Sequence, residues 1–328
     1  MGKNSNLHAA KVAKNDEFYT RLDDIAKEMV YYRPHFKNKV VLCNCNDAAH
    51  TGFAQFFSLQ FEILGLKELI CTSFAMNEGE HGVVYRYKGD KNGNRIPDID
   101  EWEQTPMHGN GGFNTPEGLA LIDEADIVIT NPPFSLFREF VGVLMEHNKK
   151  FLIIGNMNAI IDKIVFPLLK ENKIWLGTQH IKEFVSDSGE TKKFGNIIWF
   201  TNLDHKRRHE EIILYKKYNE EEYPKYENYN AIDVNKVADI PLDYDGVMGV
   251  PVSFMDKYCP EQFEIIGNIN DTDWCKNNGV GRIGEEIISR LRGQGNKSHV
   301  TANMHSIFFI KNEKVSLPFS RILIRLKK

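Results

Sequence analysis

Four consecutive residues, Asn131-Pro132-Pro133-Phe134, bring together an amide, two prolines and an aromatic ring. They follow an apolar run, residues 125–130, which has the composition of a buried β-strand. Ligands of open α/β sheets bind in the crevice outside the carboxyl ends of such strands. The four residues are therefore candidates for holding a flat molecule that carries an amino group.

The chemistry of such a site follows from the residue types. An exocyclic amine on a nucleobase is a poor nucleophile, because its lone pair is delocalised into the ring. The Asn131 side-chain oxygen and the Pro132 carbonyl are two acceptors. By accepting hydrogen bonds from the two N–H groups of the amine, they could localise this lone pair on the nitrogen. The prolines stiffen the turn, since each has φ fixed near about −65°. Phe134 is suited to lie flat against an extracted base, and the methyl group of S-adenosylmethionine would be the electrophile.

The same four residues also have a purely structural interpretation. A Pro-Pro pair after a strand is an ordinary way to end that strand and begin a loop. The strand before the motif and the helical pattern at residues 137–145 after it favour the functional interpretation.

The first part of the chain alternates strand and helix patterns, which predicts a parallel sheet of the α/β class. Residues 79–112 are polar and rich in glycine, and residues 88–94 are expected to form a hairpin tip or a mobile loop. The expected strands are residues 39–43, 68–72, 125–130, 151–155, 174–176 and 196–200, and the expected helices are residues 23–32, 52–64, 116–123 and 137–145.

The composition changes after about residue 202. Residues 216–230 are crowded with Lys, Glu, Asn and Tyr, which is typical of a linker or surface arm. We expect a catalytic and cofactor-binding domain at residues 1–203, and a linker with a smaller β-rich region at residues 204–328. The strands expected in the second region are residues 247–254, 263–266, 306–310 and 322–326.

The length, composition, cysteine count and net charge of the chain limit the classes of protein to which it can belong. The 328 residues are 42% hydrophobic, enough for one large or two modest domains. No apolar run is long enough to cross a bilayer and no signal pattern precedes the chain, so we expect a cytoplasmic protein. The five cysteines lack paired spacing, which indicates reduced thiols. Cys43 and Cys45 could suggest a metal site, but the second ligand pair of a zinc site is missing, so we expect no metal and interpret them as buried strand cysteines. The net charge of −4 neither supports nor excludes DNA binding.

Two turns and one N-terminal segment are candidates for cofactor binding. The Cys43-Asn44-Cys45-Asn46-Asp47 turn follows the first strand, where nucleotide-binding α/β proteins hold their cofactor. Its Asn and Asp residues are also ordinary turn formers. Gly111 and Gly112 precede Phe113, which could lie against an adenine ring or be a core residue.

The N-terminal segment is residues 14–20. Thr20 or Asp23 is suited to capping the first helix. In the functional interpretation, Tyr19 and Thr20 contact the amino-acid end of the cofactor, where an aromatic ring near a sulfonium gains cation–π stabilisation.

Two basic segments are candidates for DNA contact. One holds Lys206, Arg207 and Arg208 between two histidines, and the other, residues 290–299, carries Arg290, Arg292 and Lys297 among small residues. Either segment could instead be an ordinary solvated face. The glycines of the second segment favour a loop that follows a phosphate backbone.

The chain resembles the EcoRI-type adenine-specific DNA methyltransferases over nearly its full length. The Asn-Pro-Pro-Phe motif is shared by many amino-group methyltransferases, whereas the Cys-Asn-Cys turn in place of a glycine-rich one is more specific. The resemblance is carried by residues 15–20, 41–47, 125–141, 149–156, 199–203, 246–251, 256–258, 260–267 and 321–325.

This resemblance implies a Rossmann-like methyltransferase sheet, S-adenosylmethionine as donor, and N6 of adenine in double-stranded DNA as acceptor. It also implies a smaller C-terminal β-rich target-recognition region. Trp199 would be a second wall for the extracted base, although an interior tryptophan on a strand is an equal alternative. Asn131, Pro132, Pro133 and Phe134 would surround the target amine, and Tyr19, Thr20, Asn44, Cys45, Asp47, Phe113 and Asn114 would line the cofactor pocket.

One position departs from the family pattern. Related enzymes commonly carry an acidic residue before the phenylalanine that aligns with Phe113, and this chain has Gly112 there. The cofactor's adenine amine would then be contacted by Asn114 or by a backbone group.

Two other functions remain open: methyl transfer to RNA or to a protein glutamine amide, and a DNA-binding module whose catalytic site has decayed. We expect a bacterial or phage-encoded monomer that works on double-stranded DNA, and a cognate restriction endonuclease in the same system stays an open alternative.

Overall fold

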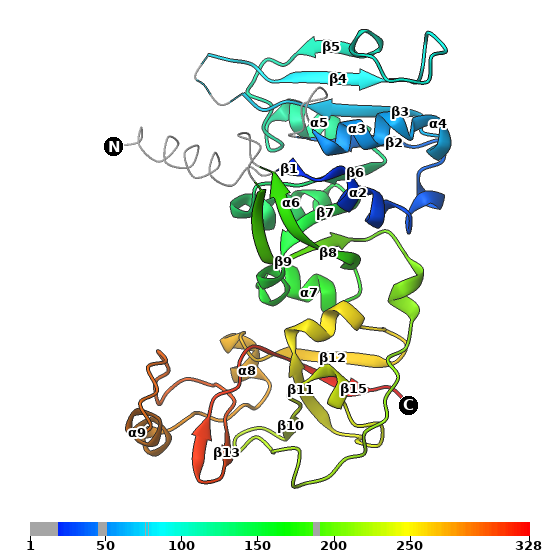
Figure 1. The fold of residues 1–328 in the computed structure, drawn as a ribbon. Coiled ribbons are helices and arrows are strands. Elements are labelled where there is room, and N and C mark those ends of the chain that lie inside the picture. The colour runs from blue at the N-terminus through cyan, green and yellow to red at the C-terminus, as the bar shows by residue number, and fades with distance from the viewer. Residues whose placement is uncertain (1–18, 45–50, 76, 78, 186–190) are drawn as a thin grey trace. The chain divides into compact units, whose positions relative to one another are not determined.

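The computed structural model describes residues 19–44, 51–75, 77, 79–185 and 191–328. The chain divides into two compact units (Figure 1). The first unit comprises Met1–Ala159 and Ile174–His205, and the second comprises Ile160–Lys173 and Lys206–Lys328. Ile160–Lys173 lies within the range expected for the catalytic domain, but it belongs to the second unit.

The first unit is built on a nine-stranded sheet with the order β1-β8-β9-β7-β6-β2-β3-β4-β5. Its four central strands are parallel and consist almost wholly of buried apolar residues, as expected for strands covered on both faces. The sequence predicted all four of them. They are β2 (Val40–Cys43), β3 (Glu68–Thr72), β6 (Ile127–Thr130) and β7 (Lys150–Asn156).

Antiparallel strands extend this parallel centre on both sides. The predicted strands near residues 175 and 200 are confirmed, but each is 11 residues long. The predicted hairpin within residues 79–112 is also confirmed, and at its tip the Asp90 carboxylate accepts the backbone N–H groups of Asn92, Gly93 and Arg95. The flanking strands are β1 (Tyr19–Thr20), β4 (Val83–Tyr87), β5 (Glu103–Pro106), β8 (Trp175–Val185) and β9 (Thr191–Thr201).

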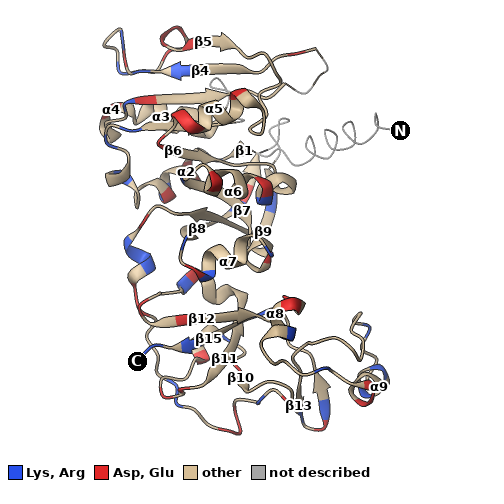
Figure 2. Ribbon diagram, turned by 180° about the vertical axis from the view of Figure 1, so that it is seen from behind, with Lys and Arg blue, Asp and Glu red and all other residues tan. Residues whose placement is uncertain are grey.

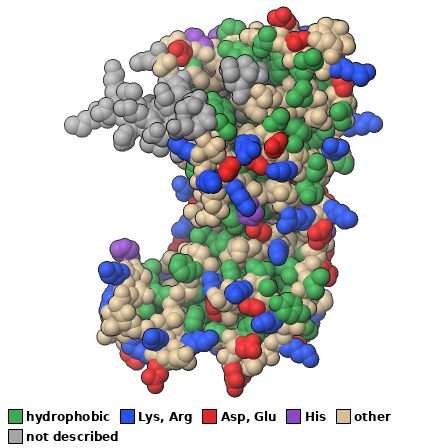
Figure 3. Space-filling model, in the orientation of Figure 1, with side chains coloured by type: hydrophobic (Ala, Val, Ile, Leu, Met, Phe, Trp, Pro, Cys, Tyr) green, Lys and Arg blue, Asp and Glu red, His purple; other side chains and the backbone are tan. Residues whose placement is uncertain are grey.

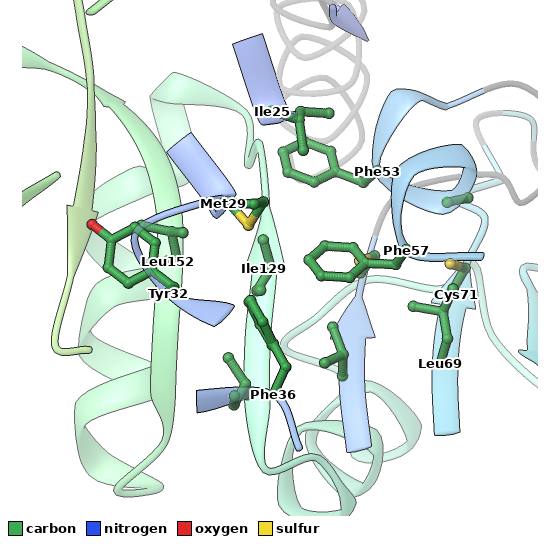
Figure 4. Packing of buried hydrophobic residues seen from close by; sticks show 14 of the residues in the cluster. Ile25, Met29, Tyr32, Phe36, Phe53, Phe57, Leu69, Cys71, Ile129 and Leu152 are labelled. Carbon is green, nitrogen blue, oxygen red and sulfur yellow. The ribbon is translucent and has the colours of Figure 1, made fainter. Parts of the chain in front are cut away.

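Helices cover both faces of the sheet. Figure 4 shows side chains of α2 and α3 packed with Leu69, Ile129 and Leu152 of the strands, which defines the main core. On the other face, α5 contacts β2 and α6 contacts β7. The helix expected at residues 52–64 is divided at Gln60, whose ψ of 6° is not helical. The helices are α2 (Leu22–Met29), α3 (Gly52–Leu59), α4 (Phe61–Leu64), α5 (Pro116–Glu124) and α6 (Phe137–Glu146).

The second unit contains a four-stranded sheet with the order β10-β11-β15-β12 and a separate hairpin of β13 and β14. Strands were predicted near the positions of β11, β12, β13 and β15, whereas the helices of this unit were not predicted. The elements are β10 (Ala231–Asp233), β11 (Val247–Pro251), β12 (Phe263–Asn268), β13 (Phe309–Lys311), β14 (Lys314–Ser316) and β15 (Arg321–Leu326), with α7 (Val165–Lys170), α8 (Thr272–Asn277) and α9 (Glu285–Gly293).

Two contacts of the second unit correct the sequence analysis. Tyr226, in the segment expected to be a linker or surface arm, is buried and donates a 2.7 Å hydrogen bond to Asp233. That segment is therefore partly a core segment. Lys170 of α7 donates a 2.7 Å hydrogen bond to the Ile266 carbonyl of β12, which explains why α7 belongs to this unit.

Candidate active site

The strand order of the first unit creates one position at which a ligand crevice is expected. From β2 the chain moves to β3 on one side, and it later returns to β6 on the other side of β2. β2 and β6 are parallel neighbours, with Leu42 opposite Val128. Ligands of open α/β sheets bind at such a switch point, outside the carboxyl ends of the strands.

Asn44 and Asn131 lie at this point, directly after β2 and β6. Thr130, the last residue of β6, donates a 2.7 Å hydrogen bond from its hydroxyl to the Asn44 carbonyl. The side-chain oxygens of both asparagines are buried. The structure thus brings together two residues that are 87 positions apart in the chain and that the sequence analysis had assigned to the cofactor and to the amine.

The two prolines after Asn131 have different surroundings. The Pro133 carbonyl accepts the Leu136 N–H at 2.9 Å and so begins the 3-10 turn η3 (Phe134–Leu136), which leads into α6. Pro132 is buried, and its carbonyl accepts no backbone hydrogen bond from the residues that the structure describes. Of the two carbonyls, that of Pro132 therefore remains the better acceptor for a ligand.

Phe134 lies at the margin of the main core and is only partly buried. Its ring contacts Phe184 of β8 and Phe194 of β9 edge-on, at centroid distances of 6.4 Å for each pair. These two partners could not be predicted from the sequence, because their contact with Phe134 depends on the pairing of distant strands.

Thr20 approaches the same end of the sheet from the N-terminal side. Its hydroxyl is buried and has no hydrogen-bond partner among the described residues. A Cβ on Gly52, the first residue of α3, would lie 2.5 Å from the Thr20 carbonyl, so this close approach requires glycine. The predicted cap of the first helix by Thr20 or Asp23 is wrong, since Arg21 holds the N-cap position of α2 without a side-chain bond.

The glycine-rich loop lies against the end of β3. Gly111 has φ of 85°, and a Cβ there would lie 2.2 Å from the Ser73 carbonyl, so only glycine fits. Phe113 is buried edge-on against Phe140 of α6 at 4.8 Å, which favours the core interpretation of this residue. Asn114 is exposed and donates a 3.0 Å hydrogen bond to Glu139 in the first turn of α6.

Trp199 lies inside the main core, with 0% of its surface exposed and its ring edge-on to Phe53 at 6.0 Å. Of its two interpretations, the structure favours the interior tryptophan. Among the remaining candidates, Cys45 and Asp47 lie outside the described residues, as do residues 14–18 of the N-terminal segment.

The cysteines of the described part of the chain are free and buried, and Cys43 lies on a strand, as predicted. Cys43 of β2 lies opposite Cys71 of β3. Burial raises the pKa of the Cys43 thiol well above its ordinary value. This thiol therefore stays protonated and unreactive at neutral pH.

A buried carboxylate that the sequence analysis missed anchors α2 to β8. Glu28 accepts hydrogen bonds from the backbone N–H groups of Thr178 and Gln179 at 2.8 Å, and from the Tyr32 hydroxyl at 2.9 Å. Gly177 gives it room, since a Cβ there would meet the carboxylate at 2.4 Å. A charged residue at a core position of an amphipathic helix was the signal that could have revealed it.

The two basic segments lie in the second unit. Lys206 and Arg207 are exposed in the 3-10 turn η5 (Lys206–His209), whereas the adjacent His205 belongs to the first unit and is buried. Figure 2 shows basic positions on α9 and β13. On the face seen in Figure 3, Lys and Arg side chains are interspersed with acidic ones rather than forming one basic surface.

Arginines of the second segment hold its loop together. Arg292 donates hydrogen bonds to the carbonyls of Asn296 and Ser298 at 2.8 Å and to that of Val300 at 3.2 Å. Arg290 donates a 2.8 Å bond to the Glu313 carbonyl in the β13–β14 turn. Lys297 is exposed on the loop that Arg292 organises.

The described residues contain no cluster of three or more His, Cys, Asp or Glu side chains arranged to hold a metal ion. None of the helices formed by these residues has the length and apolar character required to cross a membrane.

The mixed sheet, with its four parallel central strands and an antiparallel strand between β7 and β8, is that of a Rossmann-like methyltransferase. The family model described as "Adenine-specific methyltransferase EcoRI" matches residues 6–327. The chain belongs to this EcoRI-type methyltransferase family.

Three proteins that are similar in sequence to this chain are named as Type II methyltransferases. M.EcoRI of Escherichia coli is 45% identical, over 80% of this chain and 89% of the relative. M.MpnI of Mycoplasma pneumoniae is 40% identical, over 88% of this chain and 94% of the relative. M.MgeORF184P of Mycoplasma genitalium is 34% identical, over 88% and 95%. No solved structure matched the chain.

Proposed function

We propose that this chain transfers a methyl group from S-adenosylmethionine to N6 of an adenine in double-stranded DNA, at a specific sequence. The observation that carries the proposal is the placement of Asn131 and the Pro132 carbonyl beside the Asn44 turn, at the switch point of a methyltransferase sheet. The proposal of adenine as the target base rests on the description of the family. The proposal of a Type II system rests on the names of the relatives.

The residues around Thr20 fit the cofactor. The buried Thr20 hydroxyl, which has no hydrogen-bond partner in the part of the chain that the structure describes, would be satisfied by a polar group of a ligand, since a buried hydroxyl left unpaired is costly. The close approach of the Thr20 carbonyl to Gly52 places Thr20 at the N-terminus of α3. We assign Tyr19, Thr20 and Asn44 to the cofactor, with Cys45 and Asp47 of the same turn. The bound donor supplies a methyl group on a positively charged sulfur.

The chain's own residues would prepare the acceptor. The Asn131 side-chain oxygen and the Pro132 carbonyl accept hydrogen bonds from the two N–H groups of the amine. These bonds direct the lone pair of the nitrogen away from the ring. The stiff Pro-Pro turn keeps both acceptors in place, because the Pro133 carbonyl is held by Leu136. Phe134 packs against the extracted base. The nitrogen gains the methyl group as the bond between this methyl and the sulfur breaks, which leaves a neutral thioether, and the amine releases one proton to water.

The second unit would bind the duplex. Lys206, Arg207 and Lys297 are exposed cations suited to phosphates, while Arg290 and Arg292 shape the loop that presents Lys297. Arg208, which is half-buried beside Asn172, is assigned to the same surface. As part of the proposal, the chain acts as a monomer in the cytoplasm, alongside a cognate endonuclease.

The proposal is tested by supplying methyl-labelled donor with unmethylated duplex DNA, RNA or protein in separate reactions. We expect label in DNA alone, and sequencing that detects N6-methyladenine should then find it at one recurrent sequence. Label in RNA or protein instead would contradict the proposal. Binding of DNA without any transfer at saturating donor would favour the decayed module.

A further inference from the structure

Three aromatic rings beside the Asn131 turn form a cluster in which each ring is nearly perpendicular to the other two. Phe134 is inclined at 79° to Phe184 and at 80° to Phe194, with 6.4 Å between centroids in both pairs. Phe184 and Phe194 are 5.4 Å apart at 90°. The positive edge of one ring therefore meets the negative face of another, which is a preferred aromatic geometry.

The three rings differ in burial and in origin. Phe184, on β8, is fully buried in the main core, whereas Phe134 and Phe194 are partly buried at its margin. Phe134 belongs to η3 and Phe194 to β9, whose pairing with β8 places Phe194 beside Phe184. The cluster is thus anchored in the core, and it supports Phe134 from two directions.

We propose that Phe184 and Phe194 are positioning residues that hold the Phe134 ring in the orientation that receives the extracted base. This inference rests on the proposed function. Because two neighbouring rings contact the Phe134 ring edge-on, this ring cannot rotate freely. The part of the Phe134 ring that is not covered therefore keeps one orientation. The rate of methyl transfer depends on such alignment, because the amine must meet the methyl group within a narrow range of geometries.

The two positioning residues have different connections. Phe184 pairs in register with Thr20 where β1 joins β8, so a change at Phe184 also reaches the residue assigned to the cofactor. Phe194 pairs with no residue of β1, because it lies on β9. A substitution of Phe194 therefore tests the support of Phe134 without directly changing a residue that pairs with Thr20.

The test uses the full-length chain and the variants Phe134→Leu, Phe194→Leu, Phe194→Tyr and the double variant Phe134→Leu/Phe194→Leu. Phe36→Leu is the matched control, because Phe36 makes an edge-on contact with Phe57 at 5.5 Å in the same core, before β2. Single-turnover transfer to unmethylated plasmid DNA gives the rate, titration with S-adenosylmethionine gives the cofactor Kd, and circular dichroism reports folding.

We expect Phe194→Leu to slow transfer by about 10- to 100-fold with the cofactor Kd unchanged. Phe194→Tyr, which keeps the ring, should retain most of the rate, and Phe36→Leu should lower stability without slowing transfer. The double variant should be no slower than Phe134→Leu, because Phe194 acts only through Phe134. If Phe194→Leu does not fold, Phe194→Met serves in its place.

Other outcomes would overturn the inference. One such outcome is a double variant whose fold-loss in rate equals the product of the two single fold-losses. Another is a loss of rate in Phe36→Leu as large as that in Phe194→Leu. Either result would show that Phe194 has only a general structural role. These results are distinguishable from failure of the proposed function, in which the unaltered chain would transfer no methyl group to DNA.

Discussion

The hydroxyl of Thr130 donates a 2.7 Å hydrogen bond to the carbonyl of Asn44. Thr130 directly precedes Asn131, and Asn44 directly follows β2. Because both strands end at the switch point, this bond ties the proposed amine-binding turn to the proposed cofactor turn. The spacing of the two reacting groups would therefore depend on Thr130.

Replacing Thr130 with Val keeps the shape of the side chain but removes the hydroxyl. We expect the free energy of unfolding to fall by about 1–2 kcal/mol, and both cofactor affinity and methyl transfer to decline. Urea unfolding and a cofactor titration measure these effects.

Thr201→Val is the matched control for this change. The buried Thr201 hydroxyl donates a 2.6 Å hydrogen bond to the Phe151 carbonyl, near the amino end of β7. It should lower stability at least as much while leaving the cofactor Kd unchanged. Equal loss of affinity in both variants would refute a specific role for Thr130.

The parallel centre of the fold could be predicted because short apolar runs ending in polar turns are a local signal. The strand before Asn131 and the helix after it are therefore as expected. The pairing of Asn44 with the Asn131 turn also follows from chain order, since a strand order that reverses beside the first strand makes the two strand ends adjacent.

Other features depend on non-local contacts and could not be predicted. Nothing in the local pattern of Phe184 or Phe194 indicates that both rings meet Phe134. Trp199 is an apolar residue on a strand, and only the position of α3 decides that it is covered. Ile160–Lys173 joins the second unit through contacts with residues about 100 positions later, for which the local sequence carries no signal.

Glu28 gives the stability of the chain a specific pH dependence. Burial raises the pKa of this carboxyl from 4.5 despite the hydrogen bonds that favour its charged form. The folded chain thus binds this proton more tightly than the unfolded chain does. The contribution of Glu28 to stability is present below pH 4.5 and decreases as pH rises through the folded-state pKa.

This sign is tested with Glu28→Gln, whose side chain does not titrate. The free energy of unfolding of the unaltered chain, minus that of the variant, should decrease as pH rises from 4.5 and then become constant. Urea unfolding at a series of pH values gives this difference. A difference that rises with pH would mean that the hydrogen bonds outweigh burial.

A buried ion pair holds the sheet of the second unit. Arg321 of β15 donates from Nε to Asp233 of β10 at 3.0 Å, and both side chains are more than 90% buried. Arg321→Ala should lower the free energy of unfolding by about 3–5 kcal/mol, because the Asp233 charge stays buried without its cationic partner and keeps, among the described residues, only the hydrogen bond from Tyr226. Denaturant unfolding measures this loss.

Arg325→Ala on the same strand is the control for that change. Arg325 and Glu264 are 3.9 Å apart and about half exposed, so removing this pair should cost less than about 1 kcal/mol. Similar costs for the two arginines would contradict the role assigned to burial.

Lys297 should contribute to DNA affinity through a phosphate. Lys297→Ala would then weaken binding at all sequences and reduce the slope of log affinity against log salt by about one. Fluorescence titration with duplex DNA at several salt concentrations measures this slope. Lys67→Ala, an exposed lysine before β3, is the control and should leave the slope unchanged, so a shift of equal size there would exclude a specific contact.

The central claim concerns Asn131, and the most direct measurement compares Asn131→Ala with the unaltered chain in two assays. Titration with S-adenosylmethionine gives the cofactor Kd, and single-turnover transfer to unmethylated duplex DNA gives the rate at N6 of adenine. We predict a nearly unchanged Kd and a rate lowered by about 10²–10³-fold or more. A variant that methylates adenine at the rate of the unaltered chain would contradict the account.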